Sequence, residues 1–419
     1  MRAQAHQKNR MHIPSQSSLS DLEAFLPRIH DFIQRAHAHS PTRTFDCPSA
    51  AALDAEFNTV ACELFRHQVQ SNPAYAAFCK NRGQAIEQVL NWRQIPAIPT
   101  HAFKELEVTS LPSAMRGRVF HSSGTTEQRP SRHFHSPASL ELYEASLLPW
   151  FESHLLSDFE ALVDQQLLGP LDRPGMIFLI PDPEQTPHSS LAHMMGAVRD
   201  RFASVDSFFA GQLSASGEWL LDMDRLLFAL RKSMCSNRPL WILGTAFNFV
   251  HLLDHFQSHS IRYRLATGSR VMETGGYKGR SRELSKSELH AGIGGRLGIG
   301  PSHIVCEYGM SELSSQAYDL RVGEGHGELE TASRRFRFPP WARVRLISPE
   351  TGNEVSDGHV GLIEIVDLAN AFSAMAIRTE DLGRRDGDAF ELLGRANQAE
   401  SRGCSLMSLG EERSRKQLR

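Results

Sequence analysis

The stretch GMIFLIPDP, residues 175–183, is the segment that decides the fold class. It is a short, nearly continuous apolar run ended by prolines, which is typical of a buried strand in a parallel sheet. PLWILGTAF (239–247), RYRLATGSRV (262–271) and SHIVCEYGMSE (302–312) have the same form, and helical stretches such as 218–234 lie between them. Strands that alternate with helices predict an α/β sheet.

The segments on either side of this core have a different character. On the N-terminal side, apolar spacing predicts a helix capped by Ser20 or Asp21, and residues 49–83 predict two helices separated by a break at Asn72-Pro73. On the C-terminal side, residues 341–368 indicate a β-hairpin with a Gly/Asn turn, followed by further strands.

These patterns divide the chain into three parts. We expect a disordered N-terminal tail over residues 1–18, a large domain over 19–393 and a short C-terminal segment over 394–419. Within the large domain we expect a helical part over 19–92, an α/β core over about 93–335 and a β-rich part over about 336–393.

The composition excludes several classes of protein. A net charge of -3 over 419 residues gives no basic field, so we expect no nucleic-acid partner. The six cysteines form no CxxC pair, which argues against a zinc ribbon or a disulfide framework and suits a reducing compartment. The N-terminus is too polar for a signal peptide, and the apolar run at 239–253 is too short for a membrane span. We therefore expect a cytoplasmic protein without a membrane span.

A loop rich in small hydroxyl groups follows the apolar segment Val119-Phe120. Ser122, Ser123, Gly124, Thr125 and Thr126 offer backbone N–H and side-chain O–H donors, which suit phosphate oxygens. The spacing is not that of a Walker A motif. Taken alone, the loop is equally well explained as a Ser/Thr-rich turn.

Three later segments carry further polar side chains close to expected strand ends and turns. EYGMSELSSQAYD (307–319) places Glu312 just after a strand, and AIRTEDLGR (376–384) places Asp381 at an expected strand end before a glycine turn. LLGRANQAESRGCSL (392–406) contains Gly394-Arg395 and then Cys404. Taken alone, Glu312 is an ordinary solvated acid and Asp381 an ordinary turn residue. A functional role for these two residues is indicated only when they are considered together with the other motifs, in their order along the chain.

Six motifs follow one another in a recognisable order: IPAIPTHAFK (95–104), HSSGTT (121–126), METGGYKGR (272–280), EYGMSELSSQAYD (307–319), RTEDLGR (378–384) and RGCSL (402–406). In this order the chain resembles the adenylate-forming (ANL) superfamily and, more closely, the LuxE-type acyl-protein synthetases. The resemblance implies an ANL-type large domain of layered α/β sheets with a later small β-rich subdomain, a helical N-terminal region and a truncated C-terminal domain.

The same resemblance implies an activity. It is the ATP-dependent conversion of a fatty acid to an acyl-adenylate, with transfer of the acyl group to a cysteine of the enzyme. A partner reductase, an acyl-CoA reductase-type protein similar to LuxC, then receives the acyl group and reduces it to an aldehyde.

The resemblance also implies roles for individual residues. The thioester-forming cysteine would be Cys404, with Arg402 lowering the pKa of its thiol. Glu312 would act in catalysis by holding Mg²⁺, which prefers oxygen ligands. The phosphates of the nucleotide would be held by Ser122, Ser123, Gly124, Thr125 and Thr126. The adenine would be lined by Gly275, Gly276 and Tyr277, and Tyr308, Gly309 and Ser311 would border the nucleotide pocket. Asp381 would bind the ribose, and Arg395 would approach the ribose or a phosphate.

The chain departs from the superfamily pattern in two places. EQRPSR replaces the usual glycine and lysine after the loop, so Arg129 or Arg132 is the candidate for the missing charge, although Glu127 opposes phosphate binding. We expect the C-terminal domain with its catalytic lysine to be truncated, since only a short tail follows Gly394-Arg395, and this leaves Lys104 and Lys278 as weak replacements. The expected truncation argues against an ordinary CoA ligase.

Two other functions stay open at this stage. One is a ligase that passes a different acid to CoA or to a carrier protein. The other is a non-catalytic nucleotide-binding subunit of a reductase complex, which would show no ATP–pyrophosphate exchange.

Three local patterns have competing interpretations. His251 and His255 lie four residues apart, as in some metal sites, but helix-surface histidines explain them better. GIGGRLGIG (292–300) fails the dinucleotide-binding spacing and predicts a helix end and turn. Cys306 is expected to be an ordinary core residue.

Overall fold

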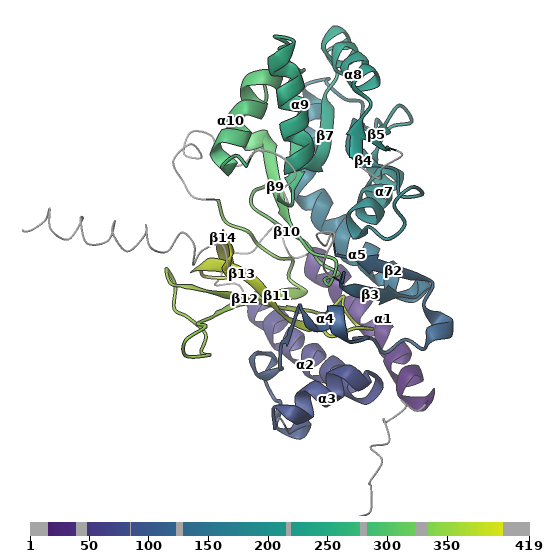
Figure 1. Cartoon of the computed structure of the whole chain (residues 1–419), viewed down its shortest axis with the longest axis vertical. Helices are drawn as coiled ribbons and strands as arrows, with labels where there is room; N and C mark the ends of the chain where they lie inside the picture. The colour runs from purple at the N-terminus through teal and green to yellow at the C-terminus, as the bar shows by residue number, and fades with distance from the viewer. Residues whose placement is uncertain are drawn as a thin grey trace, which may run out of the picture.

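Two large sheets and the helices around them make up the protein (Figure 1). The structure, a computed structural model, describes residues 16–38, 48–83, 85–122, 129–214, 219–276, 283–323 and 334–396. In Figure 1 the seven-stranded sheet and helices α8–α10 form the upper part, and the N-terminal helices form the lower part.

The α-helices described in the N-terminal part are α1 (Gln16–Ala38), α2 (Pro48–Ser71) and α3 (Pro73–Asn81). The break at Asn72-Pro73 is confirmed, because the Asn72 side chain accepts a hydrogen bond from the Tyr75 N–H and caps α3. The predicted cap of the first helix is wrong, since α1 already includes Gln16 and passes through Ser20 and Asp21. It also enters the predicted 1–18 tail.

The seven-stranded sheet has the strand order β10-β9-β8-β7-β4-β5-β6. Its strands are β4 (Gly175–Pro181), β5 (Phe208–Leu213), β6 (Trp219–Leu221), β7 (Leu240–Thr245), β8 (Arg270–Thr274), β9 (Ile304–Tyr308) and β10 (Ala317–Tyr318). The neighbours β9, β8, β7, β4 and β5 are parallel, as the apolar runs predict.

The helices around this sheet either precede β4 in the chain or lie between the strands of the sheet. They are α5 (Pro137–Leu155), α6 (Phe159–Asp164), α7 (Ser190–Phe202), α8 (Met223–Ser236), α9 (Ala246–Ser258) and α10 (Lys286–Leu297). Helix α8 starts later than the predicted 218–234, because Asp222 caps it and the preceding apolar residues form β6. The strand predicted over 262–271 is shifted as well, since only Arg270 and Val271 of that stretch lie in β8.

Each face of the sheet covers a different core. Met272 of β8 and Val305 of β9 pack in the larger core with α5 and α7. Their chain neighbours Val271 and Ile304 pack in a second core with α9 and α10. This alternation follows from the period of two in a strand and explains why the runs are apolar throughout.

The five-stranded sheet has the order β1-β13-β12-β11, with β14 also paired to β13. Its strands are β1 (Ile98–Pro99), β11 (Ala342–Ile347), β12 (Val360–Asp367), β13 (Ala376–Asp386) and β14 (Ala389–Arg395). The hairpin predicted over 341–368 is confirmed by antiparallel pairing of β11 with β12. Strand β1 joins this sheet from far away in the chain, and β14 continues to Arg395, past the predicted boundary at 393.

A short hairpin of β2 (Arg118–His121) and β3 (Arg132–His135) carries the Ser/Thr-rich loop, and the small helix α4 (Ala102–Glu105) precedes it.

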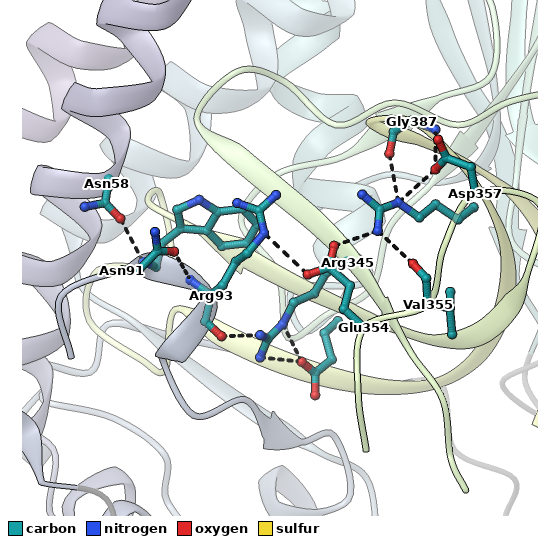
Figure 2. A network of polar contacts seen from close by, with 11 residues as sticks. Asn58, Asn91, Arg93, Arg345, Glu354, Val355, Asp357 and Gly387 are labelled. Carbon is teal, nitrogen blue, oxygen red and sulfur yellow. Dashed lines mark hydrogen bonds and ion pairs between the residues drawn. The ribbon is translucent and has the colours of Figure 1, made fainter. Parts of the chain in front are cut away.

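A polar network fastens the helical part to the five-stranded sheet (Figure 2). Asn58 of α2 accepts a hydrogen bond from the Trp92 N–H, and the Arg93 carbonyl accepts one from Arg345 of β11. Arg93 also pairs with Glu354 over 3.4 Å, and Glu354 accepts from Arg385 of β13 over 2.8 Å. These contacts join two parts of the chain that are far apart in sequence.

Candidate active site

The candidate site lies at the carboxyl ends of the central parallel strands, where open α/β sheets bind their ligands. Strand β8 ends at Thr274 and is followed by Gly275 and Gly276, while β9 ends at Tyr308 and is followed by Gly309. The two strands are neighbours in register, with Thr274 opposite Glu307. The fold therefore brings these predicted nucleotide-binding turns together.

Gly275 has a left-handed conformation with φ of +69°, and a Cβ added there or at Gly276 would meet no atom of the described residues within 4 Å. The backbone of this turn is therefore open to an approaching ligand, as expected for an adenine-lining segment. Tyr277 and Lys278 lie outside the described residues.

Tyr308, Asp381 and Arg395 meet across the two sheets. The Tyr308 hydroxyl donates a hydrogen bond to Asp381 Oδ2 over 2.9 Å. Asp381 pairs in register with Arg395, whose Nε lies 4.0 Å from Asp381 Oδ1. Burial raises the pKa of the Asp381 carboxyl, and the Tyr308 hydrogen bond opposes that shift. The Arg395 side chain is mostly exposed, so it stays available for a ligand.

Asp381 does not lie at a strand end before a turn, as the sequence suggested. It lies in the middle of β13, and Gly383 continues that strand. Strand β13 is long because it pairs with β12 on one side and β14 on the other, and its turn comes at Gly387 with φ of +61°.

The base of the Ser/Thr-rich loop touches the turn that follows β9. The Ser131 N–H donates to Ser122 Oγ over 3.0 Å, and Ser131 Oγ lies 3.4 Å from Ser311 Oγ. His133 Nδ1 lies 2.8 Å from the Ser311 carbonyl oxygen. Ser122 and Ser311, predicted from separate motifs, are thus linked through Ser131, which directly precedes β3. Ser123, Gly124, Thr125 and Thr126 lie outside the described residues, as does Glu127.

Glu312 is buried beside this contact. Its carboxylate accepts a hydrogen bond from the Ser311 hydroxyl over 2.9 Å, and its carbonyl accepts one from Asn370 over 2.9 Å. Among the described residues there is no group of three metal-ligating side chains. A Mg²⁺ ion held by Glu312 would therefore take its other ligands from triphosphate and water, which suits this ion.

Arg132 is the best placed of the candidate cations near the loop. It opens β3, and its Nη1 lies 3.4 Å from Glu107 Oε1. Its Nε is buried and has no hydrogen-bond partner in the described part of the chain. Arg129 is exposed, and Lys104 lies on α4.

Sequence reasoning missed the buried histidines of β3. His133 and His135 lie with ring centroids 4.2 Å apart, and burial lowers the pKa of His133 to about 4. The signal was present in the strand RHFH, where histidines alternate as core residues do.

The structure places the segments with competing interpretations as follows: on α10, on α9 and in β9. Residues 292–297 end α10 and Gly298 caps it with φ of +71°, so the helix end is confirmed. His251 and His255 lie on α9, and no metal cluster is found in the described segments. Cys306 is buried in β9 as expected, but Lys286 Nζ lies 2.6 Å from its sulfur. Arg402 and Cys404 lie beyond the described residues.

The profile of the family "Acyl-protein synthetase, LuxE" matches residues 49–412. The chain belongs to the LuxE family of acyl-protein synthetases. A long-chain-fatty-acid–luciferin-component ligase of Aliivibrio fischeri is 21% identical over 369 residues, which cover 82% of this chain and 85% of that protein.

Solved structures identify the fold. An open conformation of 2-hydroxyisobutyryl-CoA ligase, in complex with 2-HIB-AMP and CoA, matches with a TM-score of 0.55 at 13% identity, over 82% of this chain and 75% of that chain. The thioesterification state of the same ligase matches with a TM-score of 0.55 at 14% identity, over 82% and 68% of the two chains. The predicted adenylate-forming α/β fold is confirmed.

Membership of the LuxE family makes the protein an ATP-dependent, AMP-forming ligase. The described residues contain no helix with the length and apolar character of a membrane span.

Proposed function

We propose that this enzyme activates a fatty acid with ATP and then carries the acyl group as a thioester on Cys404. The observation that carries the proposal is the meeting of Tyr308, Asp381 and Arg395 with the turns after β8 and β9. These residues come from separate motifs and converge at the ligand-binding edge of the sheet.

In the first step, an oxygen of the fatty acid carboxylate attacks the α-phosphorus of ATP, and pyrophosphate leaves. Asp381 is suited to accept hydrogen bonds from ribose hydroxyls because an ionised carboxylate is an acceptor only. Arg395 and Arg132 supply positive charge near the phosphates. A Mg²⁺ ion on Glu312 would neutralise more of the negative charge of the triphosphate. Catalysis here is mainly positioning and electrostatics.

In the second step, the Cys404 thiolate attacks the acyl carbonyl carbon, the bond to the phosphate oxygen breaks, and AMP leaves. The thioester then passes to a partner reductase of the acyl-CoA reductase type. The name of the A. fischeri relative supports a long-chain fatty acid as the substrate. We also propose that the enzyme acts in the cytoplasm and that a short C-terminal segment after the large domain carries Cys404.

The test is intact mass spectrometry after incubation with ATP, Mg²⁺ and a series of fatty acids. We expect an acyl adduct that hydroxylamine removes and that Cys404→Ser abolishes, while ATP–pyrophosphate exchange continues. Cys235→Ser is the matched control, because Cys235 is an exposed free thiol on α8 and should leave the adduct intact.

Other results would redirect the proposal. AMP release that requires CoA or a carrier protein, without an adduct, would indicate a ligase with an external acceptor. Absence of exchange with every acid would indicate a non-catalytic nucleotide-binding subunit.

A further inference from the structure

Three side chains form a row across neighbouring strands at the candidate site. Thr274 of β8 pairs in register with Glu307 of β9, and Glu307 pairs with Tyr318 of β10. Residues that are partners across strands place their side chains on the same face of the sheet. We call Thr274, Glu307 and Tyr318 the cross-strand row.

The row faces helix α5. Met272 and Val305 lie two residues earlier on the same faces of β8 and β9, and both belong to the core that α5 covers. The Tyr318 ring stacks on His154 of α5 with centroids 4.9 Å apart. The face of the sheet toward α5 is therefore apolar at Met272 and Val305. It becomes polar at the row, which lies at the carboxyl ends of β8 and β9.

The row is buried, and its hydrogen bonding is incomplete. The Thr274 hydroxyl donates a hydrogen bond to Glu307. Burial raises the pKa of the Glu307 carboxyl to about 7, so below that pH the group is mostly neutral and is itself a donor. The Tyr318 side chain is 1% exposed, and its hydroxyl has no hydrogen-bond partner in the described residues. A buried hydroxyl without a partner requires an explanation.

The row also lies against the turn that carries Ser311 and Glu312. A Cβ added to Gly309 would lie 2.4 Å from Glu307 Oε1, so the carboxyl occupies the space that a side chain at 309 would take. Glu307 thus lies beside the turn that leads from β9 to Ser311 and Glu312 of the candidate site.

We propose that the cross-strand row selects an acid that carries a hydrogen-bonding substituent, such as a hydroxyl group, on its chain near the carboxyl end. The inference rests on the proposed function and narrows its substrate to a hydroxylated fatty acid. An unsubstituted chain in contact with the row would give the buried Tyr318 hydroxyl no partner, whereas a substituent that accepts a hydrogen bond from it would, and this difference in binding free energy favours the substituted acid. Sites built to bind a substrate hydroxyl reject the analogue that lacks it.

The experiment is ATP–pyrophosphate exchange with pairs of acids of equal chain length, one unsubstituted and one carrying a 2- or 3-hydroxyl group. We expect kcat/KM for a hydroxylated acid to exceed that of its parent by at least about tenfold. Tyr318→Phe and Glu307→Leu should bring this ratio close to one, while Glu307→Gln should retain part of it.

Tyr318→Phe is the decisive variant, because it removes a hydroxyl that has no partner in the described protein and should not lower the melting temperature. Tyr75→Phe is the matched control. It removes a buried hydroxyl that donates to the Pro96 carbonyl over 2.7 Å, far from the site, so it should lower stability and leave the ratio unchanged.

A wild-type ratio near or below one, or a ratio that Tyr318→Phe and Glu307→Leu leave unchanged, overturns the inference. If no acid supports exchange, the proposed activation fails instead. Calorimetric titration of the hydroxylated and parent acids, with ATP present, then tests whether the cross-strand row selects the hydroxylated acid. Equal affinities for the two acids, or no binding of either, overturn the inference.

Discussion

The Tyr308 hydroxyl donates to Asp381 Oδ2 over 2.9 Å, and this bond joins the last residue of β9 to the middle of β13. The two residues belong to different sheets and are 20% exposed or less. Tyr308 also packs against Phe336, Phe338 and Phe390. The bond therefore fixes the orientation of a carboxylate at the edge of the candidate nucleotide site.

Tyr308→Phe should raise the KM for ATP several-fold, because Asp381 loses the donor that orients it. The free energy of unfolding should fall by about 1 kcal/mol, the usual contribution of such a bond. Urea titration and ATP-dependent exchange measure the two effects. Tyr75→Phe should reproduce the stability loss without the change in KM, and an unchanged KM in Tyr308→Phe would show that Asp381 is oriented by other contacts.

Asp381→Asn should reduce the preference for ATP over 2′-deoxy- and 3′-deoxy-ATP. The wild-type carboxylate can accept hydrogen bonds from both ribose hydroxyls, whereas the amide offers one acceptor oxygen. We expect a loss of about tenfold in kcat/KM for ATP and a smaller loss for at least one deoxy analogue. Equal losses for all three nucleotides would place Asp381 away from the ribose.

Glu364→Gln should destabilise the five-stranded sheet. The Glu364 side chain is 1% exposed and accepts from Arg345 over 2.8 Å and from Arg378 over 2.5 Å. Arg345 also donates to the Arg93 carbonyl in the network of Figure 2. Breaking a buried ion pair costs about 3–5 kcal/mol, and the partial exposure of Arg378 favours the lower end.

Urea unfolding of Glu364→Gln measures this cost. Asp31→Asn is the comparison, because Asp31 forms an exposed pair with Arg35 and should give no measurable change. Similar midpoints for both variants would mean that the network does not fasten the sheet.

Buried neutral histidines should make the protein sensitive to acid. Burial lowers the pKa of His133 to about 4 and that of His154 to about 3, from 6.5 in the unfolded chain. Their contribution to stability is complete above pH 6.5. It is lost as the pH falls from 6.5 to the pKa values of the folded protein, because in that range the unfolded chain takes up protons and the folded chain does not. Each histidine changes the free energy of unfolding by up to about 1.4 kcal/mol per pH unit in that range.

The measurement is the urea midpoint of wild type and His154→Phe between pH 7.5 and 3.5. Glu307 acts in the opposite direction between pH 4.5 and about 7, because its raised pKa keeps a proton that the unfolded chain releases. Glu307 is present in both proteins, so the difference between their urea midpoints reports the contribution of His154 alone. As the pH falls, the midpoint of the variant should rise relative to that of wild type. Parallel curves would contradict a neutral buried His154.

Much of the local structure could be predicted from short segments. The apolar runs at 175–183, 239–247 and 302–312 form parallel strands because they are short, bounded by Pro or Gly, and buried on both faces. The glycine turns at 275–276 and 309 follow strands as expected. These features depend on residues that are close in sequence, so a single chain displays them.

Pairing between distant segments was decided only by the tertiary structure. Ile98–Pro99 joins β13, Asp381 lies in the middle of that strand, and the cross-strand row unites Thr274, Glu307 and Tyr318. Each depends on which strands become neighbours and in what register, and that is set by the packing of helices on both faces. The strands and the motifs at their ends follow from short segments of the chain, whereas packing selects which side chains meet there.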